Sequence, residues 1–290
     1  MVSMQQRAML ALLAGVLLSG LSPILVRLSP VDPGATAFWR LVAAAIMMLL
    51  FARFQVRLPL RVIGAVAAAG FLLAADLVLW NMAIVSTTIL EATLLVMLYP
   101  LLVAAAEILW LKRQLGWPLV AGGLIAFGGA ALMSLGPSTG QSSLAGNALA
   151  LTAAFFYAGS LLIIARSCRG HDVMAVTFWQ MLSAALCSLP TLLWEPNFLP
   201  ADAAAWRFVG IYGLVTVGGY LLINIGLRRI AASIAAILGY AQPVIATVIA
   251  YFLLAEMPSH IALLGGAVVL AGLFLAGAAR KPTPAAIAAS

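Results

Sequence analysis

The chain has 290 residues, of which 65% are hydrophobic and 8% are charged, and its formal net charge is +7. Because a soluble domain usually carries about a quarter charged residues, this composition excludes a water-facing exterior and makes lipid the solvent for most of the chain. The positive charges stand in small groups between apolar runs, so we interpret them as markers of membrane topology and expect no nucleic-acid partner.

The apolar runs predict an all-α integral membrane protein with ten transmembrane helices. Runs such as 41–51 and 263–279 are continuously apolar and do not alternate, which favours helices of about 20 residues over a β-barrel. The expected spans are 7–27, 34–53, 61–83, 87–111, 117–136, 145–166, 173–194, 204–226, 231–254 and 260–279. We expect the first run to be retained as a span, because it lacks a convincing small-residue cleavage site for a signal peptide.

The basic residues predict which side of the membrane each connection faces. With the N-terminus in the cytoplasm, twelve of the fifteen Lys and Arg residues fall on the cytoplasmic side: Arg7, Arg53, Arg57, Arg61, Lys112, Arg113, Arg166, Arg169, Arg228, Arg229, Arg280 and Lys281. Arg27 and Arg207 fall outside, and Arg40 lies within the second span. We therefore expect a multi-pass protein of the bacterial inner membrane with both termini in the cytoplasm.

Internal similarity divides the chain into two halves, residues 1–140 and 141–290, of five spans each. Residues 36–40 resemble residues 176–180 at an offset of 140, and an offset of 143 pairs Asn81 with Asn224 and Pro100 with Pro243. Because each half has an odd number of spans, the second half must start on the opposite side of the membrane. The pattern predicts inverted-topology repeats, which many secondary transporters use for alternating access.

The last two spans of each half carry a loose pattern of proline and glycine. Its residues are Pro243, Glu256, Gly265-Gly266 and Gly272 in the second half, and Pro100, Gly122-Gly123 and Gly128-Gly129 in the first. This pattern resembles the drug/metabolite transporter superfamily in its EamA-like ten-helix branch, and the chain is most similar there to the YddG-type aromatic amino acid exporters. Arg113 stands where the second half has Glu256, which departs from the pattern. The resemblance implies export of small solutes through a central cavity that spans one, three, four, six, eight and nine surround.

Three ionisable residues are expected in the outer third of the membrane, where a charge is costly and therefore a candidate for function: Arg40, Asp76 and Glu91. In one interpretation Arg40 forms a structural ion pair with one of the two acids. In the other, the remaining acid faces a wet cavity and binds a proton or the amine of a substrate. Glu107 is expected in a snorkelling pair with Lys112 or Arg113 at the membrane boundary.

Pro100 and Pro243 fall in the middle of their spans, where proline removes a backbone hydrogen bond and is expected to open the helix beside a central cavity. Aromatic and amide residues on nearby spans are the candidates for substrate binding: Trp80, Asn81, Tyr99, Tyr157, Tyr220, Asn224, Tyr240 and Gln242. Such a set suits a zwitterion with an apolar side chain. The alternatives are ordinary helix packing for the prolines and an interfacial belt for the aromatic rings. The glycine pairs are expected at close helix contacts.

These observations predict a secondary transporter that exports small hydrophobic or aromatic solutes, with amino acids preferred, by alternating access. The alternative is an exporter or channel-like facilitator of other small solutes. The scarcity of basic residues within the spans argues against phosphorylated cargo. The sequence has no metal-ligand set, nucleotide-binding motif or nucleophile motif, so we expect neither an enzyme nor a metal or other cofactor. The expected partners are the lipid bilayer and a small-molecule substrate, and the expected state is a monomer.

Overall fold

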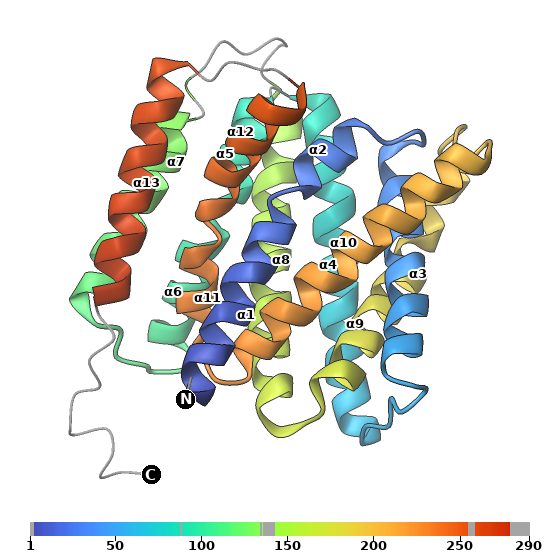
Figure 1. The fold of residues 1–290 in the computed structure, drawn as a ribbon, viewed down its shortest axis with the longest axis horizontal. Coiled ribbons are helices and arrows are strands. Elements are labelled where there is room, and N and C mark those ends of the chain that lie inside the picture. Colours follow the sequence, from blue (N-terminus) through green and yellow to red (C-terminus); the bar gives the residue numbers. More distant parts are fainter. Residues whose placement is uncertain (1–2, 88, 134, 136–142, 255–258, 279–290) are drawn as a thin grey trace.

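The computed structural model describes residues 3–87, 89–133, 135, 143–254 and 259–278, and the regular structure in these ranges is helical. In chain order the helices are α1 Met4–Ser19, α2 Ser22–Arg27, α3 Pro33–Phe51, α4 Leu60–Ser86, α5 Ile89–Val96, α6 Tyr99–Leu109, α7 Trp117–Met133, α8 Leu144–Gly170, α9 Val173–Ser188, the 3-10 helix η1 Leu189–Leu193, α10 Ala203–Leu227, α11 Ala232–Leu238, α12 Ala241–Leu254 and α13 His260–Ala278. They lie side by side with their connections at the two ends of the bundle (Figure 1).

Eight segments of the described chain are long and apolar enough to cross a membrane: Met4–Val26, Pro33–Phe51, Leu60–Ile84, Leu144–Gly170, Val173–Leu193, Ala203–Leu227, Ala232–Ile249 and His260–Gly277. Each coincides with a span predicted from the sequence. Within the other two predicted spans, 87–111 and 117–136, the described residues form the shorter apolar helices Leu94–Leu109 and Trp117–Met133.

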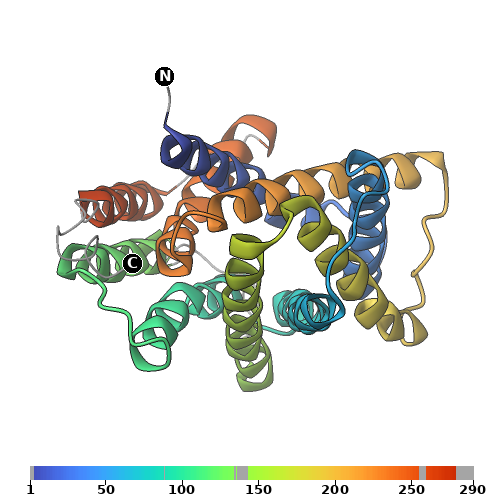
Figure 2. The ribbon, with the colours of Figure 1, turned by 90° about the horizontal axis from the view of Figure 1, so that it is seen from below.

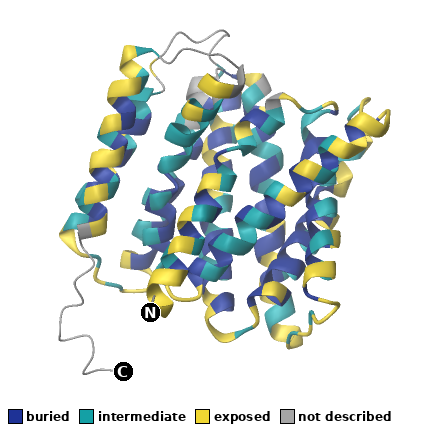
Figure 3. Cartoon of the chain, in the orientation of Figure 1, coloured by how far each residue is buried: buried dark blue, intermediate teal, exposed yellow. Residues whose placement is uncertain are grey.

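The outside of the bundle is apolar. Large apolar side chains such as Leu10, Phe252 and Phe274 are exposed, while buried residues concentrate between the helices (Figure 3). A surface of this kind is unfavourable in water and favourable against lipid chains. The main buried cluster joins α1, α4, α6, α8, α10 and α11, and these helices surround the middle of the molecule (Figure 2).

The helix starts show why several of these segments begin where they do. Ser143, Asp172 and Asp202 each precede a helix and accept a hydrogen bond from a backbone N–H of its first turn. Such residues satisfy N–H groups that have no partner within the helix. Asp172 accepts from Ala175 N at 2.9 Å, and its negative charge at the start of α9 also interacts favourably with the helix dipole.

The start of α3 is capped from the other half of the chain. Glu195 accepts hydrogen bonds from Gly34 N at 2.6 Å and from Ala35 N at 2.5 Å, through its two carboxylate oxygens. Asp32 accepts from Asn197 N at 2.9 Å, which ties the same connection to α3 a second time. No local sequence pattern relates Glu195 to the start of a helix that lies 160 residues earlier.

Replacing Glu195 with Ala is expected to lower the free energy of unfolding by about 1–2 kcal/mol, because two N–H groups at a helix start lose their acceptors. The midpoint of thermal unfolding in detergent measures the effect. Glu195→Gln is the matched variant, since it keeps one acceptor oxygen and should lose less. Equal midpoints for Glu195→Ala and the wild type would contradict this role.

Glycines allow α7 and α13 to pack against each other at one edge of the bundle, where both views place them together (Figures 1 and 2). At Gly122, Gly129, Gly265 and Gly272 a Cβ atom would lie 2.5 Å from a backbone atom of the facing helix. This confirms the predicted close helix contact. Gly128 is different, because a Cβ there would meet open space.

Candidate functional site

Asp76 of α4 is a buried acid in the middle of the bundle. Its relative exposure is 6%, and no described residue forms a hydrogen bond or ion pair with its carboxylate. Arg40 and the hydroxyls of Tyr99, Tyr157 and Tyr220 all lie within electrostatic range of it. Three of the tyrosines predicted to bind substrate, from α6, α8 and α10, thus lie within electrostatic range of one unpaired acid.

Arg40 of α3 is buried, with 3% relative exposure, and its partners are neutral. It donates hydrogen bonds to the Tyr212 hydroxyl and, at 3.1 Å, to Ser22 Oγ, and its guanidinium carbon lies 5.0 Å from the centre of the Tyr212 ring. Its Nε–H has no acceptor among the described residues. No salt bridge joins Arg40 to Asp76, so the two opposite charges face the same region without neutralising each other directly.

Tyr212 and Ser22 were missed from the sequence. Tyr212 precedes Tyr220 by eight residues on α10, about two helical turns, so the two side chains lie on a similar face. That spacing was a usable signal for Tyr212. Ser22 carried no such signal, because it reaches Arg40 from the short helix α2 only in the folded chain.

The aromatic part of the site crosses between the two halves of the chain. The Tyr99 and Tyr157 rings meet edge to face with centroids 4.6 Å apart, and the Tyr99 hydroxyl donates to Ala236 O of α11 at 3.4 Å. Trp80 Nε1 and the Tyr240 hydroxyl are buried without a hydrogen-bond partner among the described residues. Buried polar atoms normally have a hydrogen-bond partner. Because these two donors have none within the described protein, each can donate a hydrogen bond to a ligand.

The helix is interrupted just before each of the two prolines. α5 ends at Val96 and α6 begins at Tyr99, with Pro100 in its first turn. α11 ends at Leu238 and α12 begins at Ala241, with Pro243 in its first turn. At the second break, Gly239 N and Tyr240 N bond to carbonyls three residues earlier, which tightens the turn and leaves the chain free to change direction.

The two predicted asparagines have partners within the protein. Asn81 Nδ2 donates to Pro33 O at 2.6 Å, and its Oδ1 is buried without a partner. Asn224 Nδ2 donates to Thr177 Oγ1 at 3.0 Å and to Gln180 Oε1 at 3.1 Å, which ties α10 to α9. Gln242 is half-buried in the first turn of α12. Glu91 lies on α5, but its side chain is outside the described part of the structure, and Glu256 falls outside the described residues altogether.

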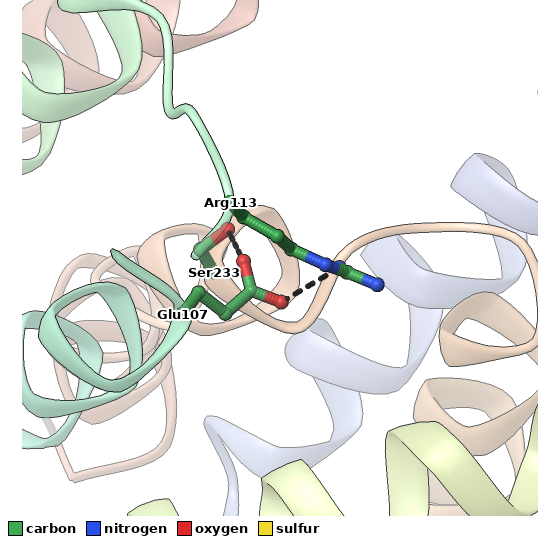
Figure 4. A network of polar contacts seen from close by, with 3 residues as sticks. All are labelled: Glu107, Arg113 and Ser233. Carbon is green, nitrogen blue, oxygen red and sulfur yellow. Dashed lines mark hydrogen bonds and ion pairs between the residues drawn. The ribbon is translucent and has the colours of Figure 1, made fainter. Parts of the chain in front are cut away.

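Glu107 forms the expected pair with Arg113, at 3.0 Å, but the expected snorkelling position was wrong (Figure 4). Its side chain has 1% relative exposure. The second carboxylate oxygen accepts a hydrogen bond of 2.5 Å from Ser233 of α11, and that helix covers the acid. The carboxylate therefore links α6 to α11, a contact that no local sequence pattern shows.

Taken together, the buried site offers one acid, one cation with a free N–H group, and several aromatic rings. An ammonium group can pair with Asp76 and a carboxylate with Arg40, while the rings of Tyr99 and Tyr157 pack against an apolar side chain.

Comparison with known proteins agrees with a transporter. The model of the EamA-like transporter family matches this chain twice, over residues 6–135 and 144–278. A solved crystal structure that is 21% identical superposes with a TM-score of 0.80 over 93% of this chain and 96% of that one, which shows a shared fold.

Three curated relatives cover much of the chain. The uncharacterized transporter YdfC of Bacillus subtilis is 28% identical over 91% of this chain and 88% of its own length. The pseudopaline exporter CntI of Pseudomonas aeruginosa is 24% identical over 90% of this chain and 92% of its own. The probable terminal-alkyne amino-acid exporter of Streptantibioticus cattleyicolor is 26% identical over 63% of this chain and 62% of its own.

Proposed function

The chain belongs to the EamA-like transporter family, and from this premise we propose that it exports amino acids with apolar or aromatic side chains by alternating access. Members of this family are multi-pass membrane transporters rather than enzymes. The names of two relatives, an exporter of pseudopaline and a probable exporter of an amino acid, support the direction of transport and the chemical class of the cargo.

The observation that carries the cargo proposal is the pair of unneutralised charges at Asp76 and Arg40. Both side chains are buried, each lies within electrostatic range of the other, and no salt bridge joins them. Burying a charge without a partner is unfavourable. A ligand that carries both an ammonium and a carboxylate group therefore gains binding free energy by pairing with each of the two buried charges. The substrate's ammonium group pairs with Asp76 and its carboxylate with the free Nε–H of Arg40.

The remaining site residues surround this charge pair. The rings of Tyr99, Tyr157 and Tyr220 contact the apolar side chain of the cargo, and Trp80 Nε1 and the Tyr240 hydroxyl donate hydrogen bonds to its polar end. Asn81 and Gln242 are further contacts for the cargo and Glu91 is a second acid for a proton or amine, whereas Asn224 is used in the contact between α9 and α10.

The architecture we propose is ten spans in two inverted repeats, residues 1–140 and 141–290, in a monomer of the inner membrane with both termini in the cytoplasm. Three observations support it. The family model matches the chain once in each half. The helix is broken before the equivalent residues Pro100 and Pro243. The last helices of the two halves, α7 and α13, pack against each other.

The broken helices also suggest the conformational state. α6 packs against α11, toward the end of the bundle where α1 begins (Figure 1). The other halves of the two broken helices pack elsewhere: α5 packs against α4 and α8, and α12 packs against α1, α2 and α13. We interpret the α6–α11 contact as a closed cytoplasmic gate in an outward-facing transporter. The hydrogen bonds of Ser233 to Glu107 and of Tyr99 to Ala236 O hold that gate.

Transport into proteoliposomes tests the proposal with a matched set of ligands. Phenylalanine is expected to be taken up. Phenethylamine and 3-phenylpropionate each lack one of its charged groups, so the concentration of either that halves phenylalanine uptake should be at least about tenfold higher than that of unlabelled phenylalanine. Counterflow of phenylalanine would exclude a channel. Equal competition by all three compounds would contradict zwitterion recognition, and absence of uptake for a panel of apolar amino acids would contradict the substrate class.

A further inference from the structure

A second charged region lies away from Asp76, beside the α6–α11 contact. It is a cavity of about 280 Å³ whose wall includes Arg113, Arg166, Arg169, Glu107, Leu162 and Ala232, and we call it the arginine pocket. Glu107 lies on α6 and Arg113 just after it, and Arg166 and Arg169 lie in the last turns of α8. Two chain segments about 50 residues apart in sequence therefore place three guanidinium groups around one space.

The positive charge of the arginine pocket is only partly neutralised. Glu107 is its one acid among the lining residues, and both oxygens of that acid are already used, by Arg113 at 3.0 Å and by Ser233 at 2.5 Å. No described residue accepts a hydrogen bond from Arg166 or Arg169. Arg113 and Arg169 repel each other, and Glu107 is the acid that attracts both. Three cations against one anion leave two positive charges without a partner.

Positive-inside topology accounts for basic residues at this end of the bundle, but it does not require them to converge. Arg57 and Arg61 serve that purpose; they are exposed, as Arg166 and Arg169 are, but they do not line the arginine pocket. The guanidinium groups of the arginine pocket instead share a concave space with the apolar side chains of Leu162 and Ala232. Guanidinium groups bind carboxylates and phosphates through paired hydrogen bonds, and a partly apolar wall strengthens that attraction.

We propose that the arginine pocket is a binding site for a small oxyanion, a carboxylate or a phosphate, with Arg166 and Arg169 as its principal ligands. Arg113 contributes a third positive charge while it remains paired with Glu107. The oxyanion has two sources, a soluble anion or the headgroup of an anionic phospholipid, and both present the same negatively charged oxygens. The site is distinct from the Asp76 cluster and does not depend on the identity of the transported cargo.

Thermal unfolding of the purified full-length protein tests this site. In neutral detergent, the unfolding midpoint is measured against sodium phosphate and sodium acetate, each compared with sodium chloride at the same ionic strength. In nanodiscs, phosphatidylcholine alone is compared with phosphatidylcholine that contains phosphatidylglycerol. The variant is Arg166→Gln/Arg169→Gln, and the control is Arg57→Gln/Arg61→Gln, which removes the same charge from the same end of the bundle.

In the wild type and the control, the unfolding midpoint is expected to rise to a plateau with at least one oxyanion. For Arg166→Gln/Arg169→Gln, the oxyanion concentration that gives half of this rise should be roughly tenfold higher or more. A response to phosphate or acetate identifies a soluble anion, and a response to phosphatidylglycerol alone identifies a lipid headgroup. If the glutamine variant does not fold, Arg166→Lys/Arg169→Lys keeps the charge but removes the paired hydrogen bonds, and it should also bind more weakly. The proposal is overturned if the wild type responds to none of the three, or if the pocket variants respond as the control does.

Discussion

Asp76→Asn is expected to reduce the transport of aromatic amino acids by roughly tenfold to a hundredfold, expressed as kcat/KM in proteoliposomes. The substitution keeps the shape of the side chain and removes the charge that pairs with the ammonium group, and a charge-assisted hydrogen bond contributes about 1.5–3 kcal/mol. Because no described residue bonds to the Asp76 carboxylate, the fold should tolerate the change. Transport within twofold of the wild type would contradict the role of Asp76.

Two further variants make this result specific. Asp202→Asn changes an exposed acid that caps α10, and asparagine caps helices about as well as aspartate, so transport should be unchanged. Glu91→Gln tests the other membrane acid on the same scale. A normal Asp76→Asn together with an inactive Glu91→Gln would assign the amine to Glu91 instead. Repeating the assay with and without a pH gradient separates an amine-binding acid from one that carries a coupled proton.

Gly129→Ala is expected to lower the free energy of unfolding by about 1–3 kcal/mol, the usual range for overpacking. The new methyl group would lie 2.5 Å from Val269 N and 2.7 Å from Gly265 O, and neither backbone atom can move without shifting α13. The midpoint of thermal unfolding in detergent and the yield of monodisperse protein both measure the loss.

The adjacent residue supplies the control. Gly128 is in the same helix, but a Cβ there meets nothing within 4 Å, so Gly128→Ala should be neutral or stabilising by up to about 1 kcal/mol. The two variants differ only in the side of α7 that carries the methyl group. Equal stability of Gly128→Ala and Gly129→Ala would show that the α7–α13 contact is looser than its geometry implies.

Prediction from the sequence succeeded where the cause is local. The eight segments that are long and apolar enough to cross a membrane match predicted spans, because composition along about 20 residues is enough to favour a helix in lipid. The close contact at Gly122 and Gly272 was also predictable, because small residues in an apolar span commonly face another helix.

The candidate site was predictable only in part. Tyr99, Tyr157 and Tyr220 were identified from their positions within apolar spans, and each lies within electrostatic range of Asp76, while their role in substrate binding stays a prediction. Asn224 was identified by the same reasoning, yet it bonds to Thr177 and Gln180 in a contact between α9 and α10. Residue type and depth in the membrane select the three tyrosines and Asn224 alike. These two criteria do not distinguish a side chain that faces a ligand from one that faces a neighbouring helix.

The sequence by itself determined that this protein lies in a membrane as a set of apolar helices, two of them broken at proline, because those properties depend on a single segment and its solvent. Only the tertiary structure decided that Arg40 pairs with Tyr212 rather than with an acid, that Ser233 buries Glu107, and that Gly129 rather than Gly128 meets α13. Each of those contacts joins residues more than 100 positions apart. Their pairing depends on how the helices are rotated and stacked, which no local pattern encodes.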